Sequence, residues 1–319
     1  MKIRAVIPPF LPKDEIERRV KVLIPDIDIV EEPDAPGRFP LEEIEVLIMT
    51  TFNQAPAEVL EKMRSLKFVQ VASTGWNTVD IDTCRRRGIM LSNIPVANSK
   101  TVAEHVILMT LALLRDARVL DAEMRRGEWP MLSGARDLAG KTFGIVGMGR
   151  IGREVAARLI PFEVATLYYD VVPVPASEEQ LLGLTRVEFP ELLQNADIVS
   201  LHLPLTPQTK GLLGEKELAM MKEGSVLINT ARAELVDPEA LHKHVGSGRI
   251  RPGLDVWPAE PPDFSDPLFK VPSSFYTPHL AGVTVEAQTR FLQETIKNVL
   301  RFVQGKEPLY RVDGLPAGK

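Results

Sequence analysis

The chain has 319 residues, of which 45% are hydrophobic and 25% are charged, and both fractions are typical of globular domains. They exclude a disordered, collagenous or coiled-coil chain, and the length favours two domains. The net charge of −5 and the lack of a long basic run give no reason to expect a nucleic acid or an anionic membrane as partner.

The sequence shows no pattern of a membrane span, a signal peptide or a metal cage. The longest apolar run, Val106–Leu114, has nine residues, which is about half of the roughly 20 that cross a bilayer. Pro8, Pro9 and Pro12 interrupt the apolar stretch near the N-terminus. The single cysteine, Cys84, excludes an internal disulfide and agrees with a reducing compartment. We therefore expect a cytoplasmic protein without a metal site.

The first third of the chain alternates short apolar strands with helical patterns, which predicts a small doubly wound α/β unit. Strands are expected at Ile3–Ile7, Glu45–Met49 and Lys67–Ala72, with helices near Pro12–Leu23 and Pro56–Met63. A long helix is then predicted from about Ser99 to Arg126. Thr101 and Glu104 stand at capping-box spacing near its start, and the helix is expected to join two domains.

A second alternation follows this helix and predicts six strands with intervening helices, the arrangement of a dinucleotide-binding domain. These strands are expected at Lys141–Gly147, Thr166–Tyr169, Asp197–Leu201, Ser225–Asn229, Gly253–Val256 and Ser274–Tyr276. The proline-rich stretch Pro258–Pro272 is predicted to be a long loop. A final amphipathic helix is expected over Thr284–Gln304. The fold class is therefore α/β, with two doubly wound parallel sheets.

The motif GMGRIG lies between an apolar strand and a helical pattern, where a GxGxxG sequence binds the pyrophosphate of a dinucleotide. Gly147 permits the tight turn, Gly149 lets the backbone approach the pyrophosphate, and Gly152 allows close helix packing. Arg150 and Ile151 belong to the same predicted cofactor loop.

An acidic residue follows the next strand at the position that selects the cofactor. Asp170 stands 18 residues beyond Gly152, where a carboxylate accepts hydrogen bonds from the adenosine ribose hydroxyls. The same carboxylate would repel a 2′-phosphate, and no Lys or Arg occurs between Asp170 and Arg186 to compensate. The pattern favours NAD over NADP.

Three further segments have a strand-to-loop form and carry groups suited to an oxo acid. They are NTARAELVDPEAL (Asn229–Leu241), GLDVWPAEPP (Gly253–Pro262) and TPHLAG (Thr277–Gly282). Together with GMGRIG and the long helix, their order and spacing resemble the D-isomer-specific 2-hydroxyacid dehydrogenases over nearly the whole chain. The resemblance implies a flavodoxin-like substrate domain, residues 1–98 and 284–319, with a Rossmann NAD domain, residues 99–283, inserted in it.

The resemblance implies three catalytic residues. Arg232 is expected to bind the substrate carboxylate, since a guanidinium holds it in a fork and polarises the adjacent carbonyl. His279 is expected to be the acid/base that protonates the carbonyl oxygen as the hydride arrives. Glu260 is expected to favour the charged imidazole and to fix its ring. The implied activity is a reversible, NAD-dependent reduction of a small anionic 2-oxo acid to a D-2-hydroxy acid.

The same resemblance implies further contacts and an assembly. Residues expected to line the NAD site, with Pro204 near the adenine and Asp255 near the nicotinamide carboxamide, are Thr101, His202, Pro204, Thr209, Thr230, Ala231 and Asp255. The loop STGWN, with Ser73, Thr74 and Gly75, is expected to meet the substrate carboxylate through backbone N–H groups. Relatives are homodimers through the NAD domain and an arm, here Ala117–Ala139. Because the chain ends at Lys319, we expect no added regulatory domain.

Trp76 and Asn77 depart from the pattern of relatives, which carry a small aliphatic residue and then an acidic one, so an altered pocket wall is expected.

Other functions on this fold stay open. NAD-sensing proteins like the C-terminal-binding-protein corepressors share the triad pattern. Formate dehydrogenases pair the histidine with glutamine, which Glu260 argues against, whereas phosphite dehydrogenases keep the glutamate.

Overall fold

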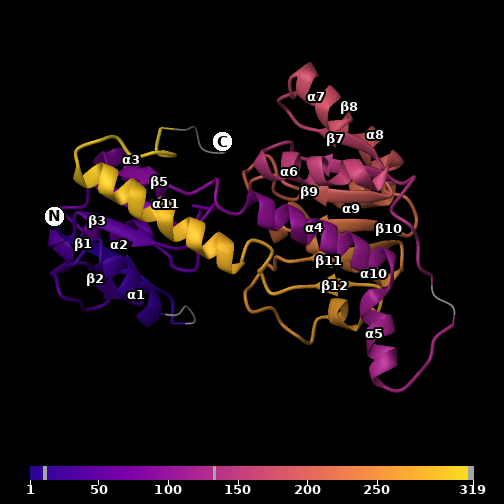
Figure 1. Cartoon of the computed structure of the whole chain (residues 1–319), viewed down its shortest axis with the longest axis horizontal. Helices are drawn as coiled ribbons and strands as arrows, with labels where there is room; N and C mark the ends of the chain where they lie inside the picture. Colours follow the sequence, from indigo (N-terminus) through magenta and orange to yellow (C-terminus); the bar gives the residue numbers. More distant parts are fainter. Residues whose placement is uncertain (10–12, 132–133, 315–319) are drawn as a thin grey trace. The chain divides into compact units, whose positions relative to one another are not determined.

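Two parallel β-sheets organise the chain, one in each of the two units into which it divides (Figure 1). The computed structural model describes residues 1–9, 13–131 and 134–314. The first unit comprises residues 1–98 and the described chain from Thr284 onward, and the second comprises Ser99–Val283. The chain thus passes from one unit to the other at Asn98–Ser99 and at Val283–Thr284.

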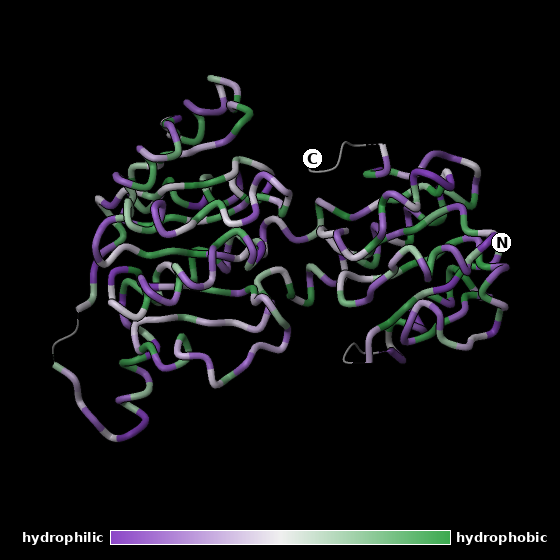
Figure 2. Tube along the Cα trace, turned by 180° about the vertical axis from the view of Figure 1, so that it is seen from behind, coloured by the Kyte–Doolittle hydropathy of each residue, from purple (hydrophilic) through white to green (hydrophobic). Residues whose placement is uncertain are grey.

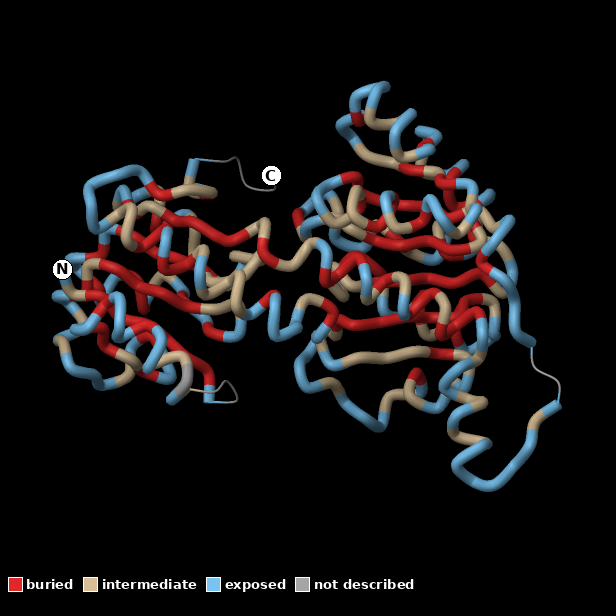
Figure 3. The backbone as a smooth tube through the Cα atoms, viewed as in Figure 1, coloured by how far each residue is buried: buried red, intermediate tan, exposed pale blue. Residues whose placement is uncertain are grey.

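The first unit has a five-stranded sheet in the order β2-β1-β3-β4-β5, which is the flavodoxin-like order. Its strands are β1 (Ile3–Val6), β2 (Asp28–Val30), β3 (Val46–Met49), β4 (Phe68–Val71) and β5 (Met90–Ser92). Its helices are α1 (Lys13–Lys21), the 3₁₀ helix η1 (Leu41–Glu43), α2 (Ala57–Lys62), α3 (Ile81–Arg87) and α11 (Val285–Val303). The strands β1, β3 and β4 are buried along their whole length because helices cover both faces (Figure 3).

A buried ion pair fixes one edge of this sheet. Arg4 on β1 and Asp28 on β2 are 1% and 4% exposed, and the Arg4 Nη2 atom lies 2.8 Å from Asp28 Oδ2. The same guanidinium donates to the carbonyl oxygens of Pro33 and Ala35, and the backbone N–H of Arg38 donates to Asp28 Oδ1. The pair therefore binds the segment after β2 to the sheet.

The second unit has a seven-stranded sheet in the order β12-β11-β10-β9-β6-β7-β8, which extends the Rossmann order by one strand. Its strands are β6 (Thr142–Val146), β7 (Ala165–Tyr169), β8 (Leu184–Arg186), β9 (Ile198–Leu201), β10 (Ser225–Asn229), β11 (Ile250–Leu254) and β12 (Phe275–Tyr276). Figure 2 shows hydrophobic residues concentrated along the strands of both units. The predicted fold class, two doubly wound parallel-sheet domains, is confirmed.

Helices cover both faces of this second sheet. They are α4 (Ser99–Leu114), α5 (Ala117–Arg125), α6 (Arg150–Leu159), α7 (Ala176–Leu182), α8 (Phe189–Asn195), α9 (Glu215–Met220) and α10 (Pro238–Gly246), with the 3₁₀ helices η2 (Ile160–Phe162), η3 (Ala233–Leu235) and η4 (Pro267–Lys270). Residues of α4 and α6 form one hydrophobic core with the sheet, and residues of α8, α9 and α10 form another. The carboxyl ends of the parallel strands meet at one edge, where such sheets bind ligands.

The prediction of one helix from Ser99 to Arg126 is wrong. Helix α4 ends at Leu114, and Asp116 has a left-handed φ of 50° before α5 begins. The carbonyl oxygens of the last turn have distant partners, because Arg251 donates to Leu113 O and the backbone N–H of Arg136 donates to Leu114 O. These two donors bond carbonyl groups that the N–H groups of a further helical turn would otherwise bond, so the helix can end here.

The expected capping box of that helix is also wrong, because α4 already begins at Ser99 and Thr101 lies inside its first turn. The short strands β2, β5 and β8 were not predicted, so the sheets have five and seven strands instead of three and six.

The predicted start of the first helix at Pro12 lies outside the described residues. Among those that are described, no helix is long and apolar enough to span a membrane.

Candidate active site

Glu260 and His279 form a close pair in the second unit. Glu260 lies in the loop after β11 and His279 lies in the loop after β12, and these strands are neighbours in the sheet. The His279 Nδ1 atom is 2.8 Å from Glu260 Oε2 and 2.9 Å from Oε1. The two side chains are 36% and 35% exposed, so the pair is accessible to solvent. The structure thus brings together two of the three predicted catalytic residues.

The turn that carries His279 is held by a buried carboxylate. His279 has a left-handed φ of 57°, a region that residues other than glycine rarely adopt. Asp255, which is 1% exposed, accepts hydrogen bonds from the backbone N–H groups of Leu280 at 2.8 Å and Ala281 at 2.9 Å. The Thr277 hydroxyl also donates to Asp255. Asp255 therefore binds the backbone that follows His279 and the Thr277 side chain that precedes it.

A histidine of α4 extends this network. The His105 Nε2 atom lies 3.1 Å from Thr277 Oγ1. Burial lowers the pKa of His105, although the nearby Asp255 acts in the opposite direction. Since the Thr277 hydroxyl donates to Asp255, it accepts a hydrogen bond from His105, which assigns the ring proton to Nε2. The motif TPHLAG contains Thr277, but the helical pattern around His105 did not predict a role for that histidine.

Trp257 contacts the loop of Glu260 and the loop of His279. Its backbone N–H donates to Glu260 Oε1 at 3.3 Å, and its indole Nε1–H donates to the carbonyl oxygen of Thr277 at 3.0 Å. The indole stacks on Phe269, with ring centroids 5.0 Å apart, and meets Tyr276 edge-on at 5.3 Å. Sequence reasoning missed this residue, although it stands three residues before Glu260 in the segment GLDVWPAEPP.

Arg232 follows β10 and interacts electrostatically with Glu260. The side chain of Asn229 fixes its backbone, accepting from the N–H of Ala231 at 3.0 Å and donating to the Arg232 carbonyl oxygen at 2.8 Å. Burial lowers the pKa of Arg232, and the charges of Glu234 and Glu260 oppose that change. A guanidinium keeps its proton under such conditions, so the site combines a cation, a carboxylate and an imidazole.

The glycine loop fits a dinucleotide. Gly147 has a φ of 98°, and a Cβ atom there would lie 2.9 Å from the carbonyl group of His202. A Cβ atom on Gly152 would lie 2.3 Å from Gly147 O, whereas one on Gly149 would meet no heavy atom within 4 Å. The first and third glycines are thus required by close packing. The space beside the middle one matches the close approach of a pyrophosphate to the start of α6.

Asp170 lies against this loop. Its Oδ2 atom accepts from the backbone N–H of Met148 at 2.6 Å, and its Oδ1 atom accepts from that of Val172 at 2.9 Å. The carboxylate is therefore fixed beside the glycine loop, where the ribose would be. The Arg186 side chain on β8 donates to the backbone carbonyl oxygen of Asp170 at 3.4 Å. A cation therefore lies close to Asp170, although the two residues are 16 positions apart in the sequence.

Other predicted cofactor positions lie in loops after β9 and β10. Burial lowers the pKa of His202 to about 3, and its Nε2 atom is 2.9 Å from Ser200 Oγ, so this imidazole is neutral. The Thr209 hydroxyl donates to the carbonyl oxygen of Pro204 at 2.6 Å and so closes a turn. Thr230 Oγ1 is buried and has no hydrogen-bond partner in the described part of the chain, which leaves it able to bond a ligand.

The predicted substrate loop lies in the first unit and is fixed by its side chains. Thr74 Oγ1 donates to Asn98 Oδ1 at 2.8 Å, and the Ser73 hydroxyl accepts from the backbone N–H of Thr51 at 3.3 Å. The indole of Trp76 packs partly buried against the core of this unit. These bonds hold the backbone around Gly75 in one conformation.

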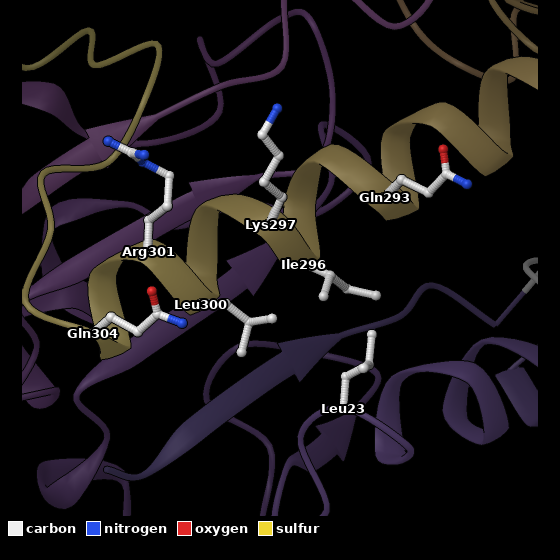
Figure 4. A pocket seen from close by; sticks show the side chains of 7 residues that line it. All are labelled: Leu23, Gln293, Ile296, Lys297, Leu300, Arg301 and Gln304. Atoms are coloured by element: carbon white, nitrogen blue, oxygen red, sulfur yellow. The ribbon is translucent and has the colours of Figure 1, made fainter.

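A separate hollow in the first unit is lined by one residue near α1 and by a face of α11 (Figure 4): Leu23, Gln293, Ile296, Lys297, Leu300, Arg301 and Gln304. It contains no predicted site residue. Within residues 1–9, 13–131 and 134–314, no group of three or more His, Cys, Asp or Glu side chains could hold a metal ion.

Comparison with known proteins identifies the family. The family described as D-isomer specific 2-hydroxyacid dehydrogenase, NAD binding domain, matches residues 107–281. The chain is 34% identical to a glyoxylate reductase of Thermococcus litoralis over 97% of this chain and 96% of that protein. It is 37% identical to a D-3-phosphoglycerate dehydrogenase of Mycobacterium leprae over 94% of this chain, but it spans only 58% of that longer protein.

The fold agrees with solved structures. The D-lactate dehydrogenase of Aquifex aeolicus, in complex with NAD and lactic acid, superposes with a TM-score of 0.87 and 29% identity, covering 96% of each chain. The glycine loop, the position of Asp170 and these relatives agree on NAD as the cofactor. The chain therefore belongs to the D-isomer-specific 2-hydroxyacid dehydrogenase family, NAD-dependent oxidoreductases that act on the CH–OH group of their substrates.

Proposed function

We propose that the protein reduces a small 2-oxo acid to the D-2-hydroxy acid, and catalyses the reverse oxidation, with Arg232, Glu260 and His279 as its catalytic residues. The observation that carries this proposal is the contact of His279 Nδ1 with both oxygens of Glu260, a carboxylate that interacts electrostatically with the Arg232 guanidinium. The names of the relatives, a glyoxylate reductase and a D-lactate dehydrogenase, support this class of substrate.

Each residue has a distinct task in this mechanism. Because Nδ1 of His279 faces Glu260, we assign proton transfer to Nε2. The carboxylate stabilises the charged imidazole, so His279 can protonate the substrate oxygen during reduction and remove that proton during oxidation. Arg232 binds the substrate carboxylate and orients the carbonyl carbon. Bound NADH supplies the hydride.

The cofactor is proposed to lie along the glycine loop, with Gly147, Gly149, Arg150, Ile151 and Gly152 at the pyrophosphate. Asp170 would accept hydrogen bonds from the ribose and disfavour NADP. The hydroxyl of Thr230, after β10, is buried and has no hydrogen-bond partner among the described residues, which supports a polar contact with the cofactor there. The remaining proposed contacts are Thr101, His202, Pro204, Thr209, Ala231 and Asp255.

The first unit is proposed to supply the substrate loop, with backbone N–H groups of Ser73, Thr74 and Gly75 meeting the carboxylate. A homodimer through the arm at Ala117–Ala139 is also proposed; residues 132–133 of it lie outside the described chain. Trp129 is 75% exposed and Met131 is 79% exposed, and such apolar side chains on an arm suit an interface. Size-exclusion chromatography with light scattering tests the dimer.

The test of the proposed function follows NADH oxidation with glyoxylate, hydroxypyruvate, pyruvate, 2-oxoglutarate and phosphohydroxypyruvate as substrates. The His279→Ala variant should lower kcat by about 100- to 10,000-fold, the range for a general acid. Arg232→Lys should raise the KM for the oxo acid strongly and change NADH affinity little, because an ammonium cannot form the bidentate contact.

Two results would contradict the proposal. Wild-type turnover that survives His279→Ala would remove the histidine from the chemistry. Tight NADH binding without turnover of any oxo acid would instead favour an NAD-sensing protein or a different substrate. Phosphite is tested separately with NAD⁺, because its oxidation would form NADH.

A further inference from the structure

We infer that Trp257 is a positioning residue, whose indole N–H fixes the turn of His279 relative to Glu260. This inference rests on the proposed function, since it takes His279 as the proton donor. Trp257 acts on the histidine turn through the hydrogen bond between its Nε1–H and the carbonyl oxygen of Thr277.

The position of Trp257 in the chain makes it a link between the two loops. Its backbone N–H donates to Glu260 Oε1, so its main chain belongs to the Glu260 loop. Its side chain crosses to the His279 loop and binds Thr277 O, two residues before His279, at 3.0 Å. One residue therefore bonds to the carboxylate on one side and to the backbone that carries the imidazole on the other.

The indole has a fixed direction because aromatic rings hold it from two elements. Phe269 of η4 stacks on it with an interplanar angle of 23°, and Tyr276 of β12 meets it at 76°. Phe269 and Tyr276 also touch each other, with centroids 5.5 Å apart. A side chain packed on two sides keeps its rotamer, so the N–H points at Thr277 O without further loss of entropy.

The bond complements the one that Asp255 supplies. Asp255 holds the Thr277 hydroxyl and the N–H groups of Leu280 and Ala281, but it does not touch the Thr277 carbonyl group. Trp257 holds that carbonyl, which belongs to the peptide between Thr277 and Pro278, directly before the left-handed backbone of His279. Without the indole N–H this peptide can rotate, which would lengthen the contact of His279 with Glu260. A longer contact stabilises the charged imidazole less.

The experiment compares Trp257→Phe with Tyr276→Phe in the full chain. Trp257→Phe keeps an aromatic ring and removes the N–H donor. Tyr276→Phe is the matched control, because its hydroxyl donates to Leu268 O at 3.0 Å within the same aromatic cluster and binds neither catalytic loop. Trp257→Tyr also lacks the Nε1–H and serves as a second variant should Trp257→Phe fail to fold. NADH affinity is measured by calorimetry and folding by thermal unfolding.

We expect Trp257→Phe to change kcat much more than KM. Trp257→Phe should lower kcat for oxo-acid reduction by about three- to tenfold, the size expected for one hydrogen bond, and change each KM by less than about twofold. The pH at which the reductive kcat/KM falls to half should move lower by some tenths of a unit. Tyr276→Phe should lower the unfolding temperature and leave both kcat and the pH profile unchanged.

Equal kinetic effects in the two variants, or an unmoved pH profile in Trp257→Phe and Trp257→Tyr, would overturn the inference and leave Trp257 a packing residue. The His279→Ala variant distinguishes this failure from that of the proposed function. Activity that survives His279→Ala refutes the role of the histidine itself. Activity that is lost in His279→Ala but unaffected in the tryptophan variants refutes only the positioning role.

Discussion

Each unit buries a carboxylate almost completely, and the two are satisfied in opposite ways. Asp28 in the first unit faces the guanidinium of Arg4 and the backbone N–H of Arg38. Asp255 in the second unit faces two backbone N–H groups and the hydroxyl of Thr277. Both buried carboxylates need compensating partners, but only Asp28 has a full opposite charge as its partner.

The difference separates stability from function. The partners of Arg4 and Asp28 are backbone groups of the segment after β2, so this ion pair closes one edge of a sheet. The donors to Asp255 all belong to the turn of His279, so this carboxylate shapes the surroundings of one imidazole. Removing the first should therefore cost mainly stability, and removing the second mainly activity.

The largest expected effect is that of Asp28→Asn on stability. The substitution leaves the Arg4 charge buried without a counter-charge, which should lower the free energy of unfolding by about 3–5 kcal/mol. Urea titration followed by circular dichroism measures the change. The control is Asp26→Asn, since Asp26 is 79% exposed and pairs with Arg38 at the surface, where the effect should stay below about 1 kcal/mol. Equal destabilisation by both variants would break the comparison.

The second effect is that of Asp255→Asn on catalysis. The amide retains one acceptor but turns a donor toward a backbone N–H group, so the His279 turn should loosen. We expect a reductive kcat lowered by about 10- to 100-fold, which is about 1.4–2.8 kcal/mol of barrier, with a smaller loss of stability. Asp263→Asn, in the exposed loop after Glu260, is the control.

Steady-state kinetics with varied NADH tests whether Asp255 has this role. A higher KM for NADH at unchanged kcat would mean that Asp255 acts through its proposed contact with the nicotinamide, and that its bonds to the histidine turn do not limit catalysis.

The smallest expected effect concerns His202, a half-buried imidazole in the second unit. Burial lowers the pKa of His202 to about 3, far below the ~6.5 of an unfolded chain. The unfolded state therefore takes up the proton first as the pH falls, and stability is lost below about pH 6.5. His202→Gln should remove on the order of 1 kcal/mol of the difference in unfolding free energy between pH 7 and pH 5.5.

His242→Gln gives the opposite sign and is the control for this measurement. Burial acts to lower the pKa of His242, but its contacts with Pro238 O and the Asp266 carboxylate outweigh burial and raise it. Its contribution to stability is present below the unfolded pKa and is lost as the pH rises through the folded value. Identical pH dependence in wild type and His202→Gln would show that the pKa of His202 is not lowered in the folded protein.

The sequence predicted the elements that hydrophobic patterns specify and missed those that distant contacts decide. The long buried strands and the helix at Thr284–Gln304, observed as Val285–Val303, follow from apolar runs and periodicity. The strand β8 has three residues, of which only Leu184 is buried, so no pattern marks it. The break between α4 and α5 depends on Arg251 and Arg136, which bond to its carbonyl groups from elsewhere in the chain.

The candidate site was predictable as a set of residue types but not as a geometry. The motifs named Glu260 and His279, and the structure adds their contact through Nδ1. The partners of Asp255 could not be read from the sequence, because a carboxylate at a strand end can face solvent, a ligand or the backbone. Trp257 and His105 act through single hydrogen bonds to Thr277, and such bonds leave no periodic trace.

The left-handed backbone at His279 has a consequence for engineering this protein. A left-handed backbone costs an L-residue about 1–2 kcal/mol, and glycine does not carry this cost. If His279 is the proton donor that we propose, a chain that exchanged it for glycine would remove this backbone strain and lose the donor. Selection for heat resistance alone would therefore enrich inactive variants at this position, so any thermostability screen of the protein has to be coupled to turnover.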